Sequence, residues 1–400
     1  MKQQILLTYG WVRSSYAALR NLASHGISVC VGDSHRIGMS QWSRLKDGYA
    51  RYPSHYVDEV AFAERISEIC LSKDIHLILP SHNETEVLAR HRKLLPPGVD
   101  ALLPSVEHCV LFNHKGQTYD FVASLGLPVP KRIPYQEIRD IAAAAASAQV
   151  RKTVIKLLTG NSAKGVHYAD GPIATQQCVL ELVESHGLER PRLPQVEEHV
   201  DGEGWGVSVL YWHGQLIASF THRRLREKIV TGGTSTLREI AHHPGIEDAA
   251  KRIFDSIGWH GLAMCEFKVC PATGQFWFIE VNPRLWGSIA LATSAGVEFP
   301  YLAWLCAAEG PDAALDYQRR QRVREPWRSR WLLGDLSVAA SELLARQPRR
   351  AWETLFSARA DYTDDVFWDD PLVFPGEIAV YLSNAIRAGS MNAAEKGMVG

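Results

Sequence analysis

Acidic and amide side chains recur at two-residue spacing in a predicted β-hairpin that turns at residues 271–274. The outgoing strand carries Glu266 between apolar neighbours, and the returning strand carries Glu280, Asn282 and Arg284. Because side chains alternate between the two faces of a strand, the latter three point to one side, and pairing about the turn places Glu266 opposite Glu280. Two facing carboxylates repel each other, so the pattern predicts a cation between them.

Carboxylate and amide oxygens are hard ligands that suit Mg²⁺, which typically takes one or two carboxylates together with nucleotide phosphates. The spacing therefore predicts a metal site formed by Glu266, Glu280 and Asn282. Arg284, one step beyond, is placed to stabilise charge on a transferred phosphoryl group or an acyl phosphate. The simpler interpretation is an ordinary hairpin in which Glu266 pairs with Lys268 or with an arginine elsewhere in the chain.

The hairpin resembles the metal-binding end of the ATP-grasp superfamily in the runs Met264-Cys265-Glu266-Phe267-Lys268 and Glu280-Val281-Asn282-Pro283-Arg284-Leu285-Trp286-Gly287-Ser288. The resemblance is greatest to the branch of carbamoyl-phosphate synthetase, which includes biotin carboxylase and many carboxylate-amine ligases. The segment 222–300 is similar to a bacterial subgroup of stand-alone ligases of that branch. The resemblance implies an α/β fold of the α+β ATP-grasp type, with a Rossmann-like domain, a lid, a body and a C-terminal helical extension.

The first hundred residues alternate between apolar strands and helices, which predicts a parallel sheet covered on both faces. The predicted strands are 4–9, 27–33, 75–80 and 99–104, and the predicted helices are 12–24, 60–73 and 84–95. The turn after the first strand lacks the glycines of a dinucleotide-binding loop, although Asp33 ends the second strand. His82 and Asn83 follow the third strand, where α/β sheets meet ligands; helix capping is the plainer reading for this turn.

The whole chain is expected to comprise four parts. These are a Rossmann-like domain (1–108), a linker helix with the lid (109–194), the catalytic body (195–312) and a partly helical C-terminal extension (313–400) that is a candidate homodimer surface.

A loop of small residues at 159–166 follows a predicted strand that ends near Lys156. Backbone N–H groups of such loops approach phosphate oxygens closely, although neither the spacing nor the ending fits a Walker A motif. The resemblance implies that Lys115 and Lys156 contact nucleotide phosphates beneath this loop, with Ser162 and Gly165 in the loop itself.

The strand predicted at 195–200 links the lid to the body. The resemblance implies that it holds adenine through Glu197 or Glu198 together with Val200, and that Glu203 contacts the ribose. The pattern does not choose between the two glutamates.

An arginine-rich run at 222–228 precedes a turn of small residues at 231–236. It is either a solvated basic loop or an anion site for a substrate carboxylate or an acyl-phosphate oxygen. The resemblance supports the anion site and implies that Arg224 and Arg226 act in catalysis beside Arg284. The predicted substrate contacts are Gly232, Gly233, Ser235 and Ser288.

Composition excludes several other classes of protein. Four hundred residues exceed one hydrophobic core, and a net charge of -1 with a pI near 7 gives no electrostatic footprint for nucleic acid or an anionic membrane. No apolar stretch reaches the roughly 18 residues of a membrane span, and no signal peptide is visible. Seven scattered cysteines without a CxxC pair predict reduced thiols in the cytoplasm.

The activity that the resemblance implies is ATP-dependent ligation with Mg²⁺, or with Mn²⁺ as the alternative metal. A substrate carboxylate attacks the γ-phosphate, ADP and an acyl phosphate form, and an amine then displaces phosphate to give an amide or peptide bond. The predicted partners are a small carboxylate and an amine, either free or carrier-bound. Two alternatives are bicarbonate activation, as in biotin carboxylase, and a non-catalytic ATP-binding module.

Overall fold

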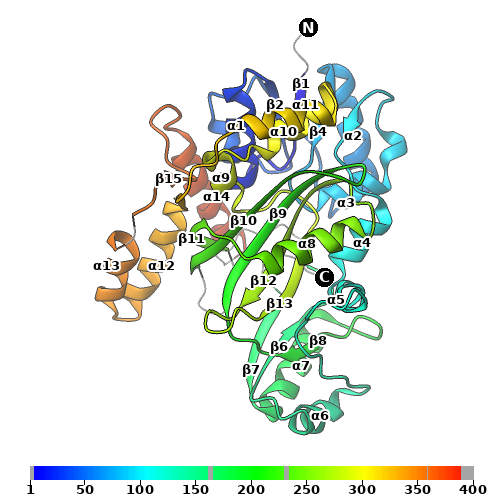
Figure 1. Ribbon diagram of the computed structural model, residues 1–400, viewed down its shortest axis with the longest axis vertical. Coiled ribbons are helices and arrows are strands. Elements are labelled where there is room, and N and C mark those ends of the chain that lie inside the picture. Colours follow the sequence, from blue (N-terminus) through cyan, green and yellow to red (C-terminus); the bar gives the residue numbers. More distant parts are fainter. Residues whose placement is uncertain (1–3, 161–164, 229–233, 358, 389–400) are drawn as a thin grey trace.

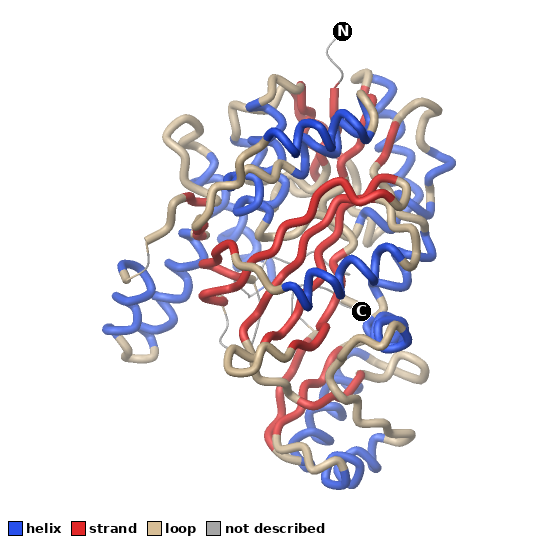
Figure 2. Tube along the Cα trace, viewed as in Figure 1, coloured by secondary structure: helices blue, strands red, loops and turns tan. Residues whose placement is uncertain are grey.

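The computed structural model describes residues 4–160, 165–228, 234–357 and 359–388. Within these ranges the strands form three sheets, which follow one another along the long axis of the molecule (Figures 1 and 2). The N-terminal sheet is parallel and the other two are mainly antiparallel, which confirms the mixed α/β fold predicted from the sequence.

The N-terminal sheet has the strand order β3-β2-β1-β4-β5, and all its strands are parallel. The strands are β1 (Gln4–Leu7), β2 (Ser28–Asp33), β3 (Gly48–Arg51), β4 (Ile75–Leu79) and β5 (Asp100–Ala101). The helices are α1 (Arg13–Ser24), α2 (Glu59–Ser72), α3 (Glu84–Arg90) and α4 (Val106–Asn113), with short 3₁₀ turns at Ser40–Trp42 and Arg92–Leu94. The sequence does not predict β3, because this edge strand buries only one of its four residues and lacks an apolar pattern.

The lid is a three-stranded antiparallel sheet in the order β7-β6-β8, covered by two helices. Helix α7 begins directly after Gly171 and ends at Gly187, which adopts a left-handed conformation with φ 58°. Buried Ile141, Ile155 and Val179 join the sheet to its helices. The elements are α5 (Lys115–Ser124), a 3₁₀ turn at Ile138–Asp140, α6 (Ile141–Ser147), β6 (Lys152–Lys156), β7 (Val166–Asp170), α7 (Pro172–His186) and β8 (Gln195–Glu198).

The body is a seven-stranded sheet in the order β13-β12-β9-β10-β11-β14-β15. Its apolar side chains on one face, such as Val207 and Phe267, pack against Ile246 and Phe254 of α8. The strands are β9 (Glu203–Trp212), β10 (Gln215–Glu227), β11 (Ser235–Ile240), β12 (Gly261–Val269), β13 (Phe276–Asn282), β14 (Arg328–Arg330) and β15 (Tyr362–Thr363). The helices next to this sheet are α8 (Pro244–Asp255), α9 (Ile289–Ala295) and α10 (Phe299–Ala308).

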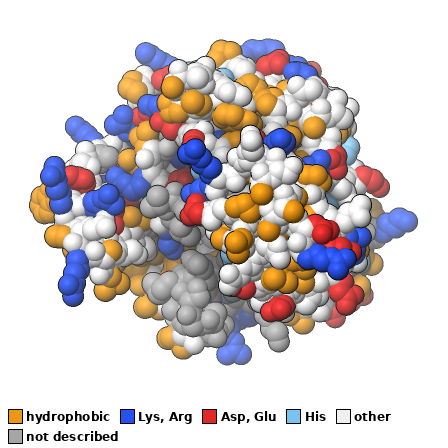
Figure 3. Space-filling view, turned by 90° about the horizontal axis from the view of Figure 1, so that it is seen from below, with side chains coloured by type: hydrophobic (Ala, Val, Ile, Leu, Met, Phe, Trp, Pro, Cys, Tyr) orange, Lys and Arg blue, Asp and Glu red, His pale blue; other side chains and the backbone are white. Residues whose placement is uncertain are grey.

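The C-terminal segment adds strands as well as helices, because β14 pairs with β11 and carries β15. Its helices are α12 (Leu332–Leu344), α13 (Pro348–Phe356) and α14 (Val373–Ala388), and α11 (Pro311–Arg320) precedes them. Lysine and arginine side chains gather over the lobe of α12 and α13, on the left of Figure 3. The same lobe exposes Leu344, Trp352 and Phe356 to solvent.

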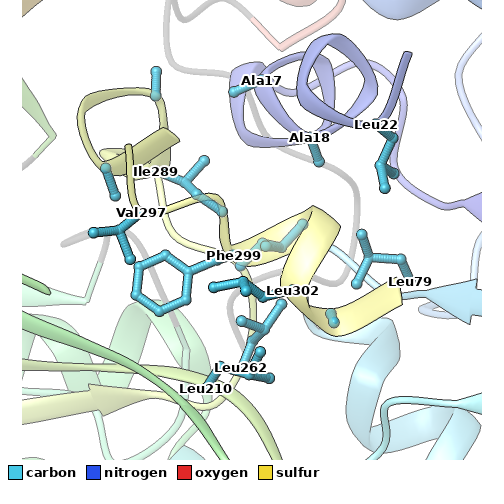
Figure 4. Close-up of a cluster of buried hydrophobic side chains, with 14 of the residues drawn as sticks. Ala17, Ala18, Leu22, Leu79, Leu210, Leu262, Ile289, Val297, Phe299 and Leu302 are labelled. Carbon is cyan, nitrogen blue, oxygen red and sulfur yellow. The ribbon is translucent and has the colours of Figure 1, made fainter. Parts of the chain in front are cut away.

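One large core joins the N-terminal sheet to the body (Figure 4). Ala18 of α1 and Leu79 of β4 share it with Leu210 of β9, and Phe299 and Leu302 of α10 lie between them. Among the described residues no single helix has the length and apolar composition to cross a membrane. The apolar pair α9 and α10, bent by 77°, passes such a test only when taken together.

This shared core predicts a difference between two leucines. Leu302 is fully buried, whereas Leu344 is 86% exposed. Leu302→Ala is expected to lower the free energy of unfolding by about 2–5 kcal/mol, because it leaves a cavity where three elements meet. The matched change Leu344→Ala is expected to stay within about 0.5 kcal/mol. Urea unfolding curves of both variants measure this, and equal losses would contradict the assignment of the core.

Candidate active site

The hairpin of β12 and β13 pairs Glu266 with Glu280, which confirms the predicted register. Cys265 and Phe267 pack with Val281 into the core beneath α8. Because side chains alternate along a strand, this packing sends both glutamates to the opposite face of the sheet. A β-bulge follows the pair, where the register shifts between Glu266 and Phe267; bulges are common beside active sites.

Polar contacts tie the two carboxylates to their neighbours. Asn282 Nδ2 donates to Oε1 of Glu266 at 3.1 Å and to Oε1 of Glu280 at 3.5 Å. Arg284 Nη2 donates in turn to Asn282 Oδ1 at 2.8 Å. Arg224 Nη2 lies 2.5 Å from Oε2 of Glu266. Glu266 therefore forms an ion pair with an arginine elsewhere in the chain, as the simpler interpretation of the hairpin predicts.

The chemistry of these donors fits a hard divalent cation. Burial raises the pKa of Glu266, the Arg224 guanidinium opposes this rise, and Glu280 adds to it. A cation beside the pair would therefore stabilise both carboxylates, and Asn282, whose amide oxygen is also a hard ligand, lies beside both of them. No group of three or more acidic, histidine or cysteine side chains suited to a metal occurs among the described residues. Water and substrate phosphates commonly complete the coordination of Mg²⁺ at such sites.

Arg224 reaches this face because the neighbouring strand carries a glycine. A Cβ at Gly204 would lie 2.9 Å from Arg224 Cδ and 3.0 Å from Glu227 Oε1. Arg224 Nη1 donates to Glu227 at 3.1 Å, so this guanidinium lies between two carboxylates. Burial works against its charge, but Glu266 and Glu227 outweigh burial and raise the pKa of Arg224.

Lys115 lies at the lid end of the same face. It is the first residue of α5, and its Nζ donates to the carbonyl oxygen of Gly160 at 2.9 Å. Burial lowers the pKa of Lys115, and the charge of Glu280 acts in the opposite direction. A smaller cavity of about 260 Å³ places Lys115 beside Glu280, Asn282 and Arg284.

The two glutamates of β8 have different surroundings. Glu197 is 2% exposed, with Oε1 2.5 Å from Lys156 Nζ and Oε2 accepting from Gln195 Nε2 at 2.9 Å. Burial opposes the charge of Lys156, but Glu197 outweighs it and raises the pKa of this lysine. Glu198 Oε1 instead accepts the backbone N–H of Lys131 at 3.0 Å. Glu197 is therefore the glutamate that is tied to the predicted phosphate lysine.

Most of the predicted site lines one cavity of about 640 Å³ between the lid, the body and the C-terminal segment. The predicted residues among its walls are Lys156, Glu197, Glu198, Val200, Arg224, Ser235, Glu266, Glu280, Asn282, Arg284 and Ser288. Predicted residues from 156 to 288 in the sequence thus converge on one space.

The structure corrects two predicted positions. Glu203 shares a face of β9 with buried Trp205, away from the cavity, and its Oε2 lies 3.6 Å from Arg223 Nη1. It is not placed to contact a ribose in the cavity. Arg226 Nη1 donates to Asp335 Oδ1 at 2.8 Å, so this side chain turns to the C-terminal helices and not to the carboxylate pair. The structure does not support its predicted role in catalysis.

Three predicted residues, Ser162, Gly232 and Gly233, lie outside the described residues. Gly165 lines neither cavity, and its carbonyl oxygen accepts from the backbone N–H of Leu157 at 2.8 Å. It therefore closes the lid hairpin, and any contact with a nucleotide stays a prediction.

The two predicted substrate serines make contacts within the protein. Ser235 Oγ donates to the carbonyl oxygens of Arg226 at 3.2 Å and Leu237 at 3.0 Å. Ser288 Oγ lies 3.1 Å from Nε2 of His222. Burial, together with the charges of Arg224 and Arg238, lowers the pKa of His222 to about 3. The ring is neutral near pH 7 and forms a polar contact rather than an ion pair.

Helix capping does not explain the polar turn after β4. Asn83 makes no side-chain cap; instead Glu84 Oε1 accepts the backbone N–H groups of Ser81 at 2.8 Å and His82 at 3.1 Å. His82 lines the larger cavity and Asn83 the smaller one. The position of His82 and Asn83 at the end of a parallel strand had predicted that they lie where ligands bind.

Sequence reasoning missed the cavity walls that come from the two ends of the chain. These residues are Trp11, Arg13, Trp331, Glu377 and Tyr381, with Lys228 beside them. No local motif marks them, because they meet only through contacts between segments more than 300 residues apart, such as the ion pair of Arg13 and Asp364.

Parts of the chain are similar in sequence to a known family and to known proteins. A family model described as ATP-grasp in the biosynthetic pathway with Ter operon matches residues 194–329, about a third of the chain. The large chain of carbamoyl phosphate synthase from Methanopyrus kandleri, N-terminal section, is 27% identical over 210 residues, which is 49% of this chain. The chain spans 36% of that relative's length, and much smaller shares of the acetyl-CoA carboxylases that it also matches.

Solved structures share the fold at low sequence identity. N5-carboxyaminoimidazole synthetase from Staphylococcus aureus, complexed with ADP, has a TM-score of 0.59 at 15% identity over 77% of each chain. Biotin carboxylase from Campylobacter jejuni, in complex with β-γ-ATP, has a TM-score of 0.58 at 13% identity over 81% of this chain and 72% of its own.

The parallel sheet, the small lid and the antiparallel body with its paired carboxylates define an ATP-grasp fold. The match of residues 194–329 to an ATP-grasp family model, together with the fold shared with biotin carboxylase and N5-carboxyaminoimidazole synthetase, supports a relationship to the ATP-grasp superfamily, in the branch of carbamoyl-phosphate synthetase and biotin carboxylase.

The buried pair of Lys156 and Glu197 predicts unequal effects of two neighbouring substitutions. Glu197→Gln leaves a buried ammonium without its carboxylate, so the free energy of unfolding is expected to fall by about 3–5 kcal/mol. Glu198→Gln, at the adjacent half-buried position, keeps an acceptor for Lys131 and is expected to cost about 1 kcal/mol or less. Chemical denaturation of the two variants measures the difference, and equal losses would show that Lys156 does not depend on Glu197.

Proposed function

We propose that this protein is an ATP-dependent ligase that activates a carboxylate as an acyl phosphate, releases ADP and joins the acyl group to an amine. The observation that carries the proposal is the facing pair Glu266 and Glu280, with Arg284 beside it, in a cavity that also contains Lys156. Such an arrangement suits phosphoryl transfer, where catalysis consists of positioning and electrostatic stabilisation.

Glu266, Glu280 and Asn282 would hold Mg²⁺, with Mn²⁺ as an alternative. When bound, the metal would supply charge neutralisation at the phosphate oxygens. ATP would lie between lid and body, with its phosphates near Lys115 and Lys156. Because Lys156 holds the Glu197 carboxylate, we assign contact with adenine to backbone groups of β8 or to Glu198, together with Val200, which lies two residues beyond β8.

Arg284 is the arginine best placed to act on the reacting groups. Its Nη2 and Nη1 donate to neutral oxygens, Oδ1 of Asn282 and the carbonyl of Leu285, at 2.8 and 3.1 Å. Arg224, by contrast, lies between Glu227 and Glu266. We therefore assign Arg284 to the developing charge on the transferred phosphoryl group and Arg224 to positioning of the metal ligand Glu266.

The reaction needs no protein nucleophile. A carboxylate oxygen attacks the γ-phosphorus and ADP leaves; the amine nitrogen then attacks the acyl carbon, inorganic phosphate leaves and the amine loses a proton. The residues of this chain bind the two substrates, exclude water and hold them in line. The carboxylate and amine are proposed to be small molecules, free or attached to a carrier.

Bicarbonate is a second candidate for the activated carboxylate. The named relatives and structural neighbours include a biotin carboxylase and a carbamoyl phosphate synthase. Bicarbonate would give carboxyphosphate at the same place, so the two candidates differ only in the acid and can be separated by the choice of substrate.

The test is analysis of nucleotide products by chromatography after incubation with ATP, Mg²⁺, pooled amino acids and either pooled small carboxylates or bicarbonate. The proposal expects ADP and phosphate whose release depends on one pool. Glu280→Gln is expected to lower this release about 100-fold or more, because a ligand of the metal is lost. Glu203→Gln, an acid-to-amide change on the other face of the same sheet, is the control and is expected to keep the activity.

Release of AMP and pyrophosphate would replace the acyl phosphate by an adenylate and overturn the mechanism. Full activity of Glu280→Gln would remove the carboxylate pair from catalysis.

A further inference from the structure

The far end of the larger cavity is formed by residues that the proposed mechanism does not use. Arg13 of α1, Lys228 directly after β10, Trp331 at the start of α12, and Glu377 and Tyr381 of α14 line this end. We refer to these five residues as the C-terminal subsite.

Two cations of the C-terminal subsite lie against one aromatic ring. Arg13 Cζ is 3.8 Å from the ring centroid of Trp331, and Lys228 Nζ is 5.6 Å from it and 5.3 Å from that of Tyr381. Aromatic faces attract cations and restrict their positions. Among the residues that the structure describes, no carboxylate forms an ion pair with Lys228. Burial lowers the pKa of Lys228, Arg13 lowers it further, and the carboxyl group of Glu377 acts in the opposite direction.

Arg13 connects this end of the cavity to the catalytic turn. Its Nη1 donates to Asp364 Oδ2 at 2.8 Å, and its Nε lies 3.7 Å from Glu377 Oε1. A Cβ built on Gly287 would lie 3.9 Å from Arg13 Nη2. Because Gly287 follows Arg284 by three residues, the C-terminal subsite borders the place proposed for phosphoryl transfer.

Glu377 adds a third hydrogen-bonding group. It is 1% exposed, and its Oε1 accepts from Trp331 Nε1 at 3.0 Å. Its Oε2 is buried without a hydrogen-bond partner among the described residues. Burial raises the pKa of Glu377 well above its usual range, and Asp365 adds to the rise. In its protonated form this carboxyl is a hydrogen-bond donor, as are the guanidinium of Arg13 and the ammonium of Lys228.

The ion pairs around the C-terminal subsite involve its arginines and not its lysine. Arg13 and the neighbouring Arg238 have carboxylate partners, and Arg13 Nε also lies 3.7 Å from Glu377 Oε1, whereas Lys228 forms no ion pair among the described residues. Asp364 pairs with both arginines, and Asp365 accepts the first N–H groups of α12. Lys228 is therefore the cation of the subsite whose ammonium is available to a bound carboxylate.

We infer that the C-terminal subsite binds a carboxylate that the ligation does not consume, carried by one of the two substrates. The inference rests on the proposed function, because the reacting group of the same molecule must lie beside Arg284. An amino acid acting as the amine carries such a group, and so does a dicarboxylate acting as the acid. A simple amine joined to a monocarboxylate would leave the subsite without a ligand.

The test is ligand-observed NMR binding to the full chain with ADP and Mg²⁺. The probes are common amino acids, the amines obtained from them by decarboxylation, and short dicarboxylates. The expected result is binding of at least one acid and a loss of about tenfold or more in affinity when its unconsumed carboxylate is removed. Lys228→Met is expected to weaken binding of the same acid to a similar extent, whereas Lys93→Met, an exposed lysine of the N-terminal domain, is the matched control.

Binding of amino acids would place the unconsumed carboxylate on the amine, and binding of dicarboxylates would place it on the acid. Three outcomes would overturn the inference: no acid binds, a decarboxylated amine binds as tightly as its amino acid, or Lys228→Met binds as tightly as the unaltered chain. If the chain binds an acid in the NMR experiment but releases no ADP from ATP with that acid in the chromatographic test, the proposed function is refuted and the subsite is retained.

Discussion

The site depends on one electrostatic constraint, the direct opposition of Glu266 and Glu280 on a partly buried face of the body sheet. Like charges at directly paired positions of two strands destabilise a hairpin unless positive charge compensates them. Arg224 supplies part of this compensation to Glu266, and Asn282 bridges both carboxylates with its amide. The apolar packing beneath α8 is what prevents the strands from turning these carboxylates to the other face. The fold thus maintains an arrangement that the hairpin alone would not favour, as expected of a functional site.

Charged side chains are also arranged along the length of the cavity. Glu197 pairs with Lys156 at the lid, while Lys115, whose pKa is lowered by burial, lies next to the carboxylate pair. At the other end, Lys228 lies near the rings of Trp331 and Tyr381 and forms no ion pair among the described residues. Cations at both ends of the cavity and two carboxylates between them agree with the proposed positions of a nucleotide, a metal and an acidic substrate.

Local periodicity predicted what depends on neighbouring residues, and long-range contacts decided the rest. Pairing about the turn, with side chains alternating between faces, predicted the hairpin register, and strands alternating with helices predicted the parallel sheet. The alternation of side chains could also have placed Glu203 on the core face with Trp205. The direction of Arg226 could not be predicted, because its partner Asp335 lies 109 residues further along the chain. The subsite formed by α1 and α14 lacked a sequence signal for the same reason, since its contacts join opposite ends of the chain.

The central claim is that the opposed carboxylates hold a divalent cation, and Mn²⁺ binding in the presence of ADP, followed by electron paramagnetic resonance, tests it most directly. The account predicts that the unaltered chain and Glu203→Gln bind Mn²⁺ with similar affinity. It also predicts that Glu266→Gln and Glu280→Gln each lose about tenfold or more in affinity, because one of two carboxylate ligands is removed. Unchanged Mn²⁺ affinity in both of these variants would contradict the account and leave the hairpin as an ion pair with Arg224.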